Sequence, residues 1–143
     1  CLVGSEMCIR DSLKAFGRNI FGTLAVQTAY TDCEYYADQL VEYLEGNLEY
    51  THRFLTEKIP EIRLGVIQAT YLLWLDCRAL KMDHLRLMDF FLDEAKVALN
   101  DGYTFGKEGD GFMRLNIACP RSQLTEALHR MAKAVTQWRT LQK

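Results

Sequence analysis

Apolar residues recur at helical spacing in four stretches of the chain. In residues 33–57 they follow an i, i+3, i+4, i+7 pattern with acidic and amide side chains between them, which predicts a long amphipathic helix. The same spacing predicts helices over residues 83–95 and 121–141. Residues 20–30 are apolar with several small side chains, and we predict a helix there with Asn19 as its N-cap.

Shorter apolar runs between these helices predict strands. Residues 62–66, 96–99 and 112–118 are each predicted to form a strand, and a glycine-rich loop precedes the last of them. Residues 69–76 are apolar on both of the faces between which strand residues alternate. This is typical of a central strand covered on both faces. The order is helix, helix, strand, strand, helix, strand, strand, helix. It predicts an α/β sandwich, with one layer of mostly antiparallel sheet packed by helices.

The first twelve residues, CLVGSEMCIRDS, have neither a helical nor a strand period. They also lack the basic start and long apolar centre of a signal peptide. The string GSEMCIRDS resembles translated sequencing-adapter read-through. We therefore expect residues 1–12 to be a non-native leader, with the tail of a longer protein beginning near Leu13; a disordered native terminus is the alternative.

Composition narrows the class of protein. The chain has 143 residues, of which 49% are hydrophobic and 25% are charged, as in a globular domain with its own core. The net charge is −2 and no basic cluster is present, which argues against a nucleic-acid binder. No apolar run approaches the ~20 residues of a membrane span. Five cysteines without a CxxC pair argue against a disulfide or zinc framework and favour a reducing cytoplasm.

One arginine stands inside a predicted strand, in the segment GFMRLNIACPR. Because strand residues alternate between faces, Arg114 and Asn116 share one face and the core-forming residues between them share the other. A guanidinium can bind a carboxylate with two parallel hydrogen bonds, and leaving it buried and unpaired is costly. An inward Arg114 therefore predicts an anionic partner. The alternative is a side chain that reaches solvent or pairs with Asp110.

The stretches TYLLWLD and GFMRLNIACPR, with LNDGYTFGKEGDG between them, resemble the C-terminal small domain of a class I/II (fold type I) pyridoxal-phosphate aminotransferase. The resemblance is to the MalY/PatB cystathionine β-lyase-like branch, the carbon–sulfur lyases. It extends upstream through NIFGTLAVQTAY and LVEYLEGNLEYTHRFL and covers about residues 15–140. It implies that residues 13–58 end the large domain and form the long connecting helix. Residues 59–143 would then be the small α/β domain.

The resemblance also implies a function. The full-length protein would use pyridoxal 5'-phosphate to cleave cystathionine or cysteine-type amino acids into a thiol, pyruvate and ammonia, and would act as a homodimer. A class I/II aminotransferase is the alternative within this fold. A non-catalytic α/β module that binds a carboxylate or supports dimerisation is the alternative of another class.

The site residues follow from the same resemblance. Arg114 would grip the α-carboxylate of the substrate, and Asn116 would support its guanidinium. Asn19 would lie near the cofactor phosphate or the subunit interface, although a simple N-cap is the alternative. The residues expected at the substrate entrance, or else in an ordinary ordered loop, are Tyr103, Phe105 and Gly106.

The family's Schiff-base lysine is expected in a Ser-x-Ser/Thr-Lys context, and none of the seven lysines of this chain has that context. The residues that contact the cofactor ring would also precede this segment. We therefore expect the chain alone to be inactive, because the cofactor and its lysine carry the central chemistry. No histidine, cysteine or acid spacing predicts a metal site.

Overall fold

The structure is a computed structural model, and it describes residues 19–141. The predicted leader over residues 1–12 lies outside this range. The described residues divide into two compact units, and the boundary falls between Leu40 and Val41. The domain boundary expected after residue 58 rests on the resemblance and stays a prediction.

The described part of the first unit is helical. Helix α2 (Ile20–Asp32) begins after Asn19, whose side-chain Oδ1 accepts a hydrogen bond from the amide of Phe21 at 2.9 Å. The predicted N-cap is therefore confirmed. No residue of α2 is buried, and its apolar side chains are exposed, with Phe21 at 79% and Tyr30 at 88%. Among residues 19–141, no helix combines the length and the apolar character that crossing a bilayer requires.

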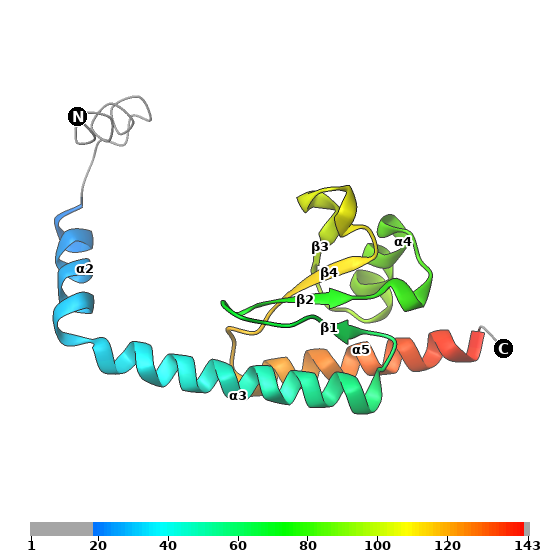
Figure 1. Ribbon diagram of the computed structural model, residues 1–143, viewed down its shortest axis with the longest axis horizontal. Helices are drawn as coiled ribbons and strands as arrows, with labels where there is room; N and C mark the ends of the chain where they lie inside the picture. The colour runs from blue at the N-terminus through cyan, green and yellow to red at the C-terminus, as the bar shows by residue number, and fades with distance from the viewer. Residues whose placement is uncertain (1–18, 142–143) are drawn as a thin grey trace, which may run out of the picture. The chain divides into compact units, whose positions relative to one another are not determined.

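The second unit is built on a four-stranded antiparallel sheet in the order β1–β2–β4–β3 (Figure 1). Its strands are β1 (Arg63–Leu64), β2 (Leu72–Asp76), β3 (Asn100–Asp101) and β4 (Phe112–Asn116). In the central pair, Leu73 lies opposite Leu115, and Leu75 lies opposite Met113. These four side chains are at most 5% exposed, so one face of the sheet belongs to the core.

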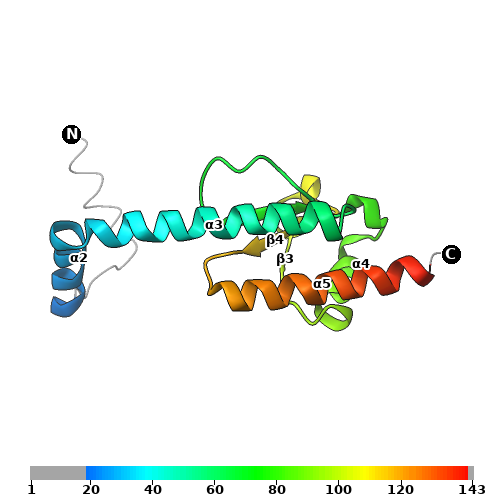
Figure 2. The same cartoon turned by 90° about the horizontal axis from the view of Figure 1, so that it is seen from below.

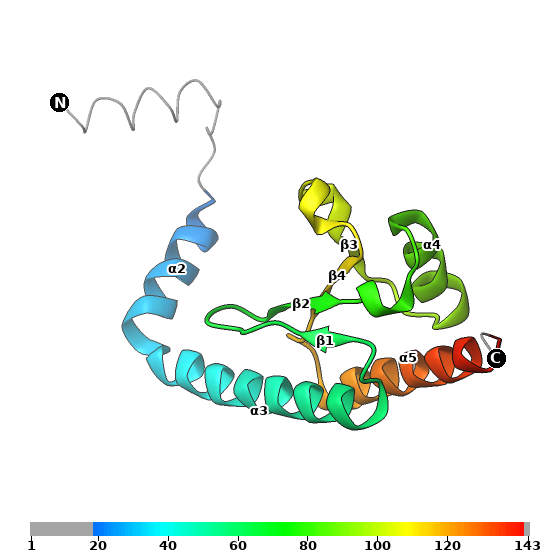
Figure 3. The ribbon, with the colours of Figure 1, turned by 45° about the vertical axis from the view of Figure 1, so that its right-hand side comes forward.

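Helices cover that core face. Helix α5 (Arg121–Leu141) and the part of α3 (Glu34–Lys58) beyond Val41 run side by side along the sheet (Figure 1; Figure 2). Helix α4 (His84–Asp89) and the π turn that follows it lie beside β3 (Figure 3). The predicted mostly antiparallel sheet with packing helices is confirmed, and the predicted range of the last helix agrees with α5.

The strands predicted over residues 62–66, 69–76 and 112–118 are all shorter in the structure. Three predictions differ more strongly. The strand expected over residues 96–99 is not formed; Lys96 has a left-handed φ of 56°, and β3 begins only at Asn100. The helix expected over residues 83–95 widens into a π turn at Phe90–Glu94, which buries the adjacent Phe90 and Phe91 completely. The central strand is covered on one face only, since alternate residues of β2 are partly exposed.

A buried asparagine joins three segments of this unit. Asn47 on α3 is 0% exposed, and its Nδ2 donates hydrogen bonds to the carbonyls of Ile117 (2.8 Å) and Cys119 (3.1 Å). Its Oδ1 accepts from Nε of Arg121, the first residue of α5, at 2.6 Å. These bonds satisfy polar groups that the sheet and helices leave unpaired where β4 turns into α5.

We expect Glu61→Gln to lower the free energy of unfolding by less than about 1 kcal/mol at pH 7 and to have no effect at acid pH. Hydrogen bonds from Arg139, at 2.6 and 2.5 Å, hold the pKa of Glu61 below its usual value. The stabilisation is therefore complete above the unfolded pKa of about 4.3 and is lost as pH falls through the folded pKa. Chemical unfolding at several pH values measures this, with Glu57→Gln as an exposed control. Parallel pH curves for the wild type and Glu61→Gln would contradict it.

Candidate functional site

The sheet face opposite the core carries the candidate site. Arg114 on β4 lies directly between Trp74 on β2 and Asn100 on β3, because these residues are cross-strand partners. Cross-strand partners share a face, so the three side chains project together away from the core. Arg114 and Trp74 are half-buried.

The guanidinium of Arg114 is held by neutral groups. Its Nη2 donates to Oδ1 of Asn100 at 3.2 Å, and its Cζ lies 4.5 Å from the centre of the Phe105 ring. Its Nε is buried and has no hydrogen-bond partner within the described range. No carboxylate of residues 19–141 pairs with it, so the ion pair with Asp110 that the sequence left open is not formed. The site thus offers a positive charge that no carboxylate of the described residues neutralises.

Aromatic rings line the same face beside Arg114. Phe105 meets the edge of Trp74, with ring centres 5.6 Å apart, and Trp74 stacks on Phe112 at 5.9 Å. At the far end of this row, the Cζ of Arg78 lies 4.8 Å from the centre of the Phe112 ring. The guanidinium of Arg114 therefore stands at one end of an apolar strip.

Arg78 differs from Arg114 in its charge environment. It donates from Nε (2.9 Å) and Nη2 (2.7 Å) to the carboxylate of Asp76. This hydrogen bonding lowers the pKa of Asp76 and raises the pKa of Arg78. Arg78 and Arg114 thus lie on one sheet face but differ in their partners. Among the described residues, Arg78 has a carboxylate partner and Arg114 has none.

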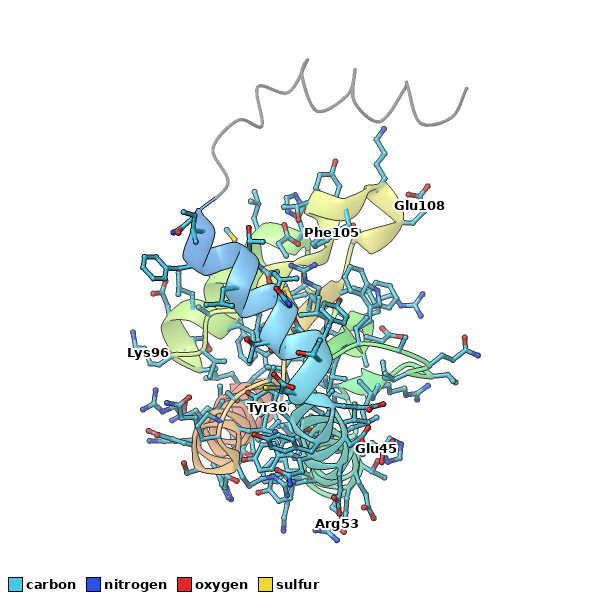
Figure 4. The ribbon with its side chains drawn as sticks, turned by 90° about the vertical axis from the view of Figure 1, so that its left-hand side faces the viewer. Tyr36, Glu45, Arg53, Lys96, Phe105 and Glu108 are labelled. Carbon is cyan, nitrogen blue, oxygen red and sulfur yellow. The ribbon has the colours of Figure 1, made fainter. Side chains whose placement is uncertain are left out.

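The loop between β3 and β4 places Phe105 over Arg114. It consists of two 3₁₀ turns, Gly102–Phe105 and Lys107–Gly109. Figure 4 shows Phe105 on the side of this loop that faces the sheet and Glu108 on its outer side. Asp101 starts the loop by accepting a hydrogen bond from the amide of Tyr103 at 3.0 Å. The Tyr103 ring stacks on His84 at 4.2 Å, and His84 Nδ1 lies 3.2 Å from Oδ2 of Asp101.

We expect Gly109→Ala to lower the free energy of unfolding by about 2–3 kcal/mol and to displace the loop. A Cβ at Gly109 would lie 2.1 Å from the carbonyl oxygen of Gly102, which is backbone and cannot rotate away. The matched control is Gly65→Ala, because a Cβ there meets nothing within 4 Å. Chemical denaturation of both variants measures the difference, and equal stabilities would show that the two glycines do not need to touch.

The other predicted site residues lie as follows. Asn116 is exposed, and its Oδ1 accepts from the amide of Ala118 at 2.8 Å; it makes no hydrogen bond to Arg114. Asn19 belongs to the other unit, at the start of α2. Gly106 has a φ of 134°, so it supplies a backbone conformation that other residues rarely adopt. The predicted roles of these residues remain predictions.

The sequence did not reveal Asn100 as the neighbour of Arg114. The predicted strand ends at residue 99, which puts Asn100 in the glycine-rich loop that follows. The signal that could have found it is its polar side chain two residues from a glycine, directly before the loop that leads into β4.

Cys77 follows β2 and is 1% exposed. Burial raises the pKa of its thiol far above the ordinary value, so this thiol stays protonated and is a poor nucleophile. Cys77 is therefore a small residue of the core.

Comparison with known proteins finds relatives of this chain in sequence and in fold. The chain is 36% identical over 126 residues to protein MalY of Escherichia coli strain K12, and 33% identical over 120 residues to cystathionine beta-lyase PatB of Bacillus subtilis strain 168. These matches cover 88% and 84% of the chain but 32% and 31% of the relatives, so the chain spans about a third of their length.

A solved structure agrees with the sequence matches. Cystalysin from Treponema denticola, which contains a pyridoxal 5'-phosphate cofactor, superposes with a TM-score of 0.85 at 34% identity. The match covers 90% of this chain and 32% of cystalysin. A scan against protein-family models finds no match.

Proposed function

We propose that the complete protein is a carbon–sulfur β-lyase. The premise is that this chain has the sequence and the fold of the C-terminal part of a fold type I pyridoxal-phosphate enzyme of the MalY/PatB type. Its substrates would be cystathionine or cysteine-type amino acids, and its products a thiol, pyruvate and ammonia. The similarity to MalY and PatB supports the reaction. The observation that carries an amino-acid substrate is the half-buried guanidinium of Arg114, which has no carboxylate partner among residues 19–141.

Arg114 would bind the α-carboxylate of the substrate. A planar guanidinium matches a carboxylate in a bidentate manner, and two such bonds fix the orientation of the amino acid as well as its position. Orientation of this kind lowers the barrier to reaction at Cα, because the reacting bond no longer has to be aligned after binding. The guanidinium of Arg114 fits this role, since no carboxylate of residues 19–141 already pairs with it.

Pyridoxal 5'-phosphate would supply the electron sink for the carbanion that forms at Cα. The residue of this chain that we propose near its phosphate is Asn19. It stands at the N-terminus of a 13-residue helix, where backbone dipoles favour an anion. Its Oδ1 is already used in the cap, so only its Nδ2 would be available to a phosphate oxygen.

The loop residues Tyr103, Phe105 and Gly106 would line the substrate entrance. Phe105 supports this proposal, because it contacts Arg114 and is 56% exposed. We also propose that the complete protein is a homodimer. Helix α2 supports a protein contact, since its apolar side chains are exposed and it buries none of them.

The reaction itself separates the proposed lyase from an aminotransferase. We expect the complete protein to release pyruvate and free thiol from cystathionine in equal amounts, measured with lactate dehydrogenase and a thiol reagent. An aminotransferase would instead need a keto-acid acceptor and would release no thiol. The chain alone should give no product with either assay. A complete protein without turnover would favour a carboxylate-binding module.

A further inference from the structure

We propose that Asn100 is a positioning residue for Arg114, and that its neutrality is the property the site requires. The amide oxygen would orient the guanidinium, and the absence of charge would leave the positive charge available to a substrate carboxylate. This inference rests on the proposed role of Arg114 as the carboxylate receptor.

The geometry restrains the guanidinium on two sides. Asn100 is the cross-strand partner of Arg114, and its Oδ1 lies 3.2 Å from Nη2. The ring of Phe105 covers one face of the guanidinium at 4.5 Å. The hydrogen bond and the ring contact together restrain the position of the group. Because both partners are neutral, neither cancels its charge.

The same sheet shows what a carboxylate would do at this position. Asp76 is the cross-strand partner of Phe112 and takes two hydrogen bonds from Arg78. A carboxylate at position 100 would face Arg114 at a similarly short range and would form an internal ion pair. That pair would compete with a substrate carboxylate for the same donors.

The acidic residue next to Asn100 contacts groups other than Arg114. Asp101 is the next residue, and its side chain accepts from the amide of Tyr103 and lies 3.2 Å from His84. Its strand partner is Met113, a core residue, and not Arg114. With an amide at position 100 and the acid at position 101, the side chain of Asp101 is directed to other partners than the guanidinium of Arg114.

Discrimination between a carboxylate and its amide tests the inference. Dissociation constants of L-alanine and L-alaninamide are measured by calorimetry, at one pH, on the complete protein with its cofactor. The affinity ratio of acid to amide in each variant is compared with that of the wild type, so the different basicities of the two ligands cancel. Both variants are checked for an unchanged melting temperature.

We expect Asn100→Asp to lower the acid-to-amide ratio by about 10- to 100-fold, because an internal carboxylate would take the place of the external one. Asn100→Ala should lower it about three- to tenfold, because the guanidinium is free but no longer oriented. Cystathionine should show the same order as a rise in KM that exceeds the fall in kcat. A purely structural role for Asn100 would weaken both ligands equally and leave the ratio unchanged.

Arg114→Ala separates this inference from the proposed function. If Arg114→Ala removes the preference for the acid but Asn100→Asp keeps it, the inference about Asn100 is wrong and the receptor assignment stands. If Arg114→Ala itself keeps the preference, the receptor is not Arg114 and the role of Asn100 fails with it. Should Asn100→Asp not fold, an unchanged ratio in Asn100→Ala is enough to overturn the inference.

Discussion

Arg114→Ala in the complete protein is expected to lower kcat/KM for cystathionine by about a hundredfold to ten-thousandfold. Two charge-assisted hydrogen bonds to the substrate carboxylate are lost, and each contributes about 1.5–3 kcal/mol. Steady-state kinetics measure the effect. The absorbance of the bound cofactor should be unchanged, because Arg114 is not proposed to touch it.

Two further variants sharpen this result. Arg114→Lys keeps the charge without the planar fork, so its activity should lie between those of the wild type and Arg114→Ala. Arg78→Ala is the matched control. It removes a guanidinium from the same sheet face, but this guanidinium already pairs with Asp76. Equal losses in Arg114→Ala and Arg78→Ala would show that general charge on this face, and not one receptor, matters.

Asn47→Ala is expected to lower the free energy of unfolding by about 3–5 kcal/mol. The substitution removes the donor to the carbonyls of Ile117 and Cys119, and the acceptor for Nε of Arg121. Asn47 is 0% exposed and its hydrogen bond to the carbonyl of Ile117 is buried, so this carbonyl loses its partner without gaining water. Urea denaturation of the chain measures the loss.

The controls for Asn47 isolate its buried hydrogen bonds. Glu49→Ala changes an exposed residue of the same helix and should cost no more than about 0.5 kcal/mol. Asn47→Asp keeps the size and the acceptor but loses both donors to the carbonyls, so it should also be destabilising. A change below 1 kcal/mol in Asn47→Ala would contradict the description of this asparagine as the joint between the helices and the sheet.

The helices and the sheet were predictable because their apolar periods are local properties. The range of α5 and the face of Arg114 both follow from spacing alone. The position of β3 was not predictable in this way. Lys96 adopts a left-handed backbone conformation after the π turn, and the strand begins only at Asn100. This conformation does not follow from the local apolar pattern.

The contacts of Arg114 depend on register, and register is set by segments distant in sequence. Asn100 is 14 residues away in sequence, and Phe105 reaches the guanidinium only because the loop folds back over the sheet. Asn47 likewise meets Cys119 across 72 residues. Spacing could place Arg114 on the face shared with Asn116, but it could not identify the neutral residues that hold the guanidinium.

A crystal structure of the complete protein with L-alanine bound tests most directly whether Arg114 receives the substrate. The account predicts both carboxylate oxygens at about 2.7–3.0 Å from guanidinium nitrogens of Arg114, with the Asn100 contact retained. A carboxylate held by other groups, with Arg114 turned to solvent or paired with an acid of the protein, would contradict it.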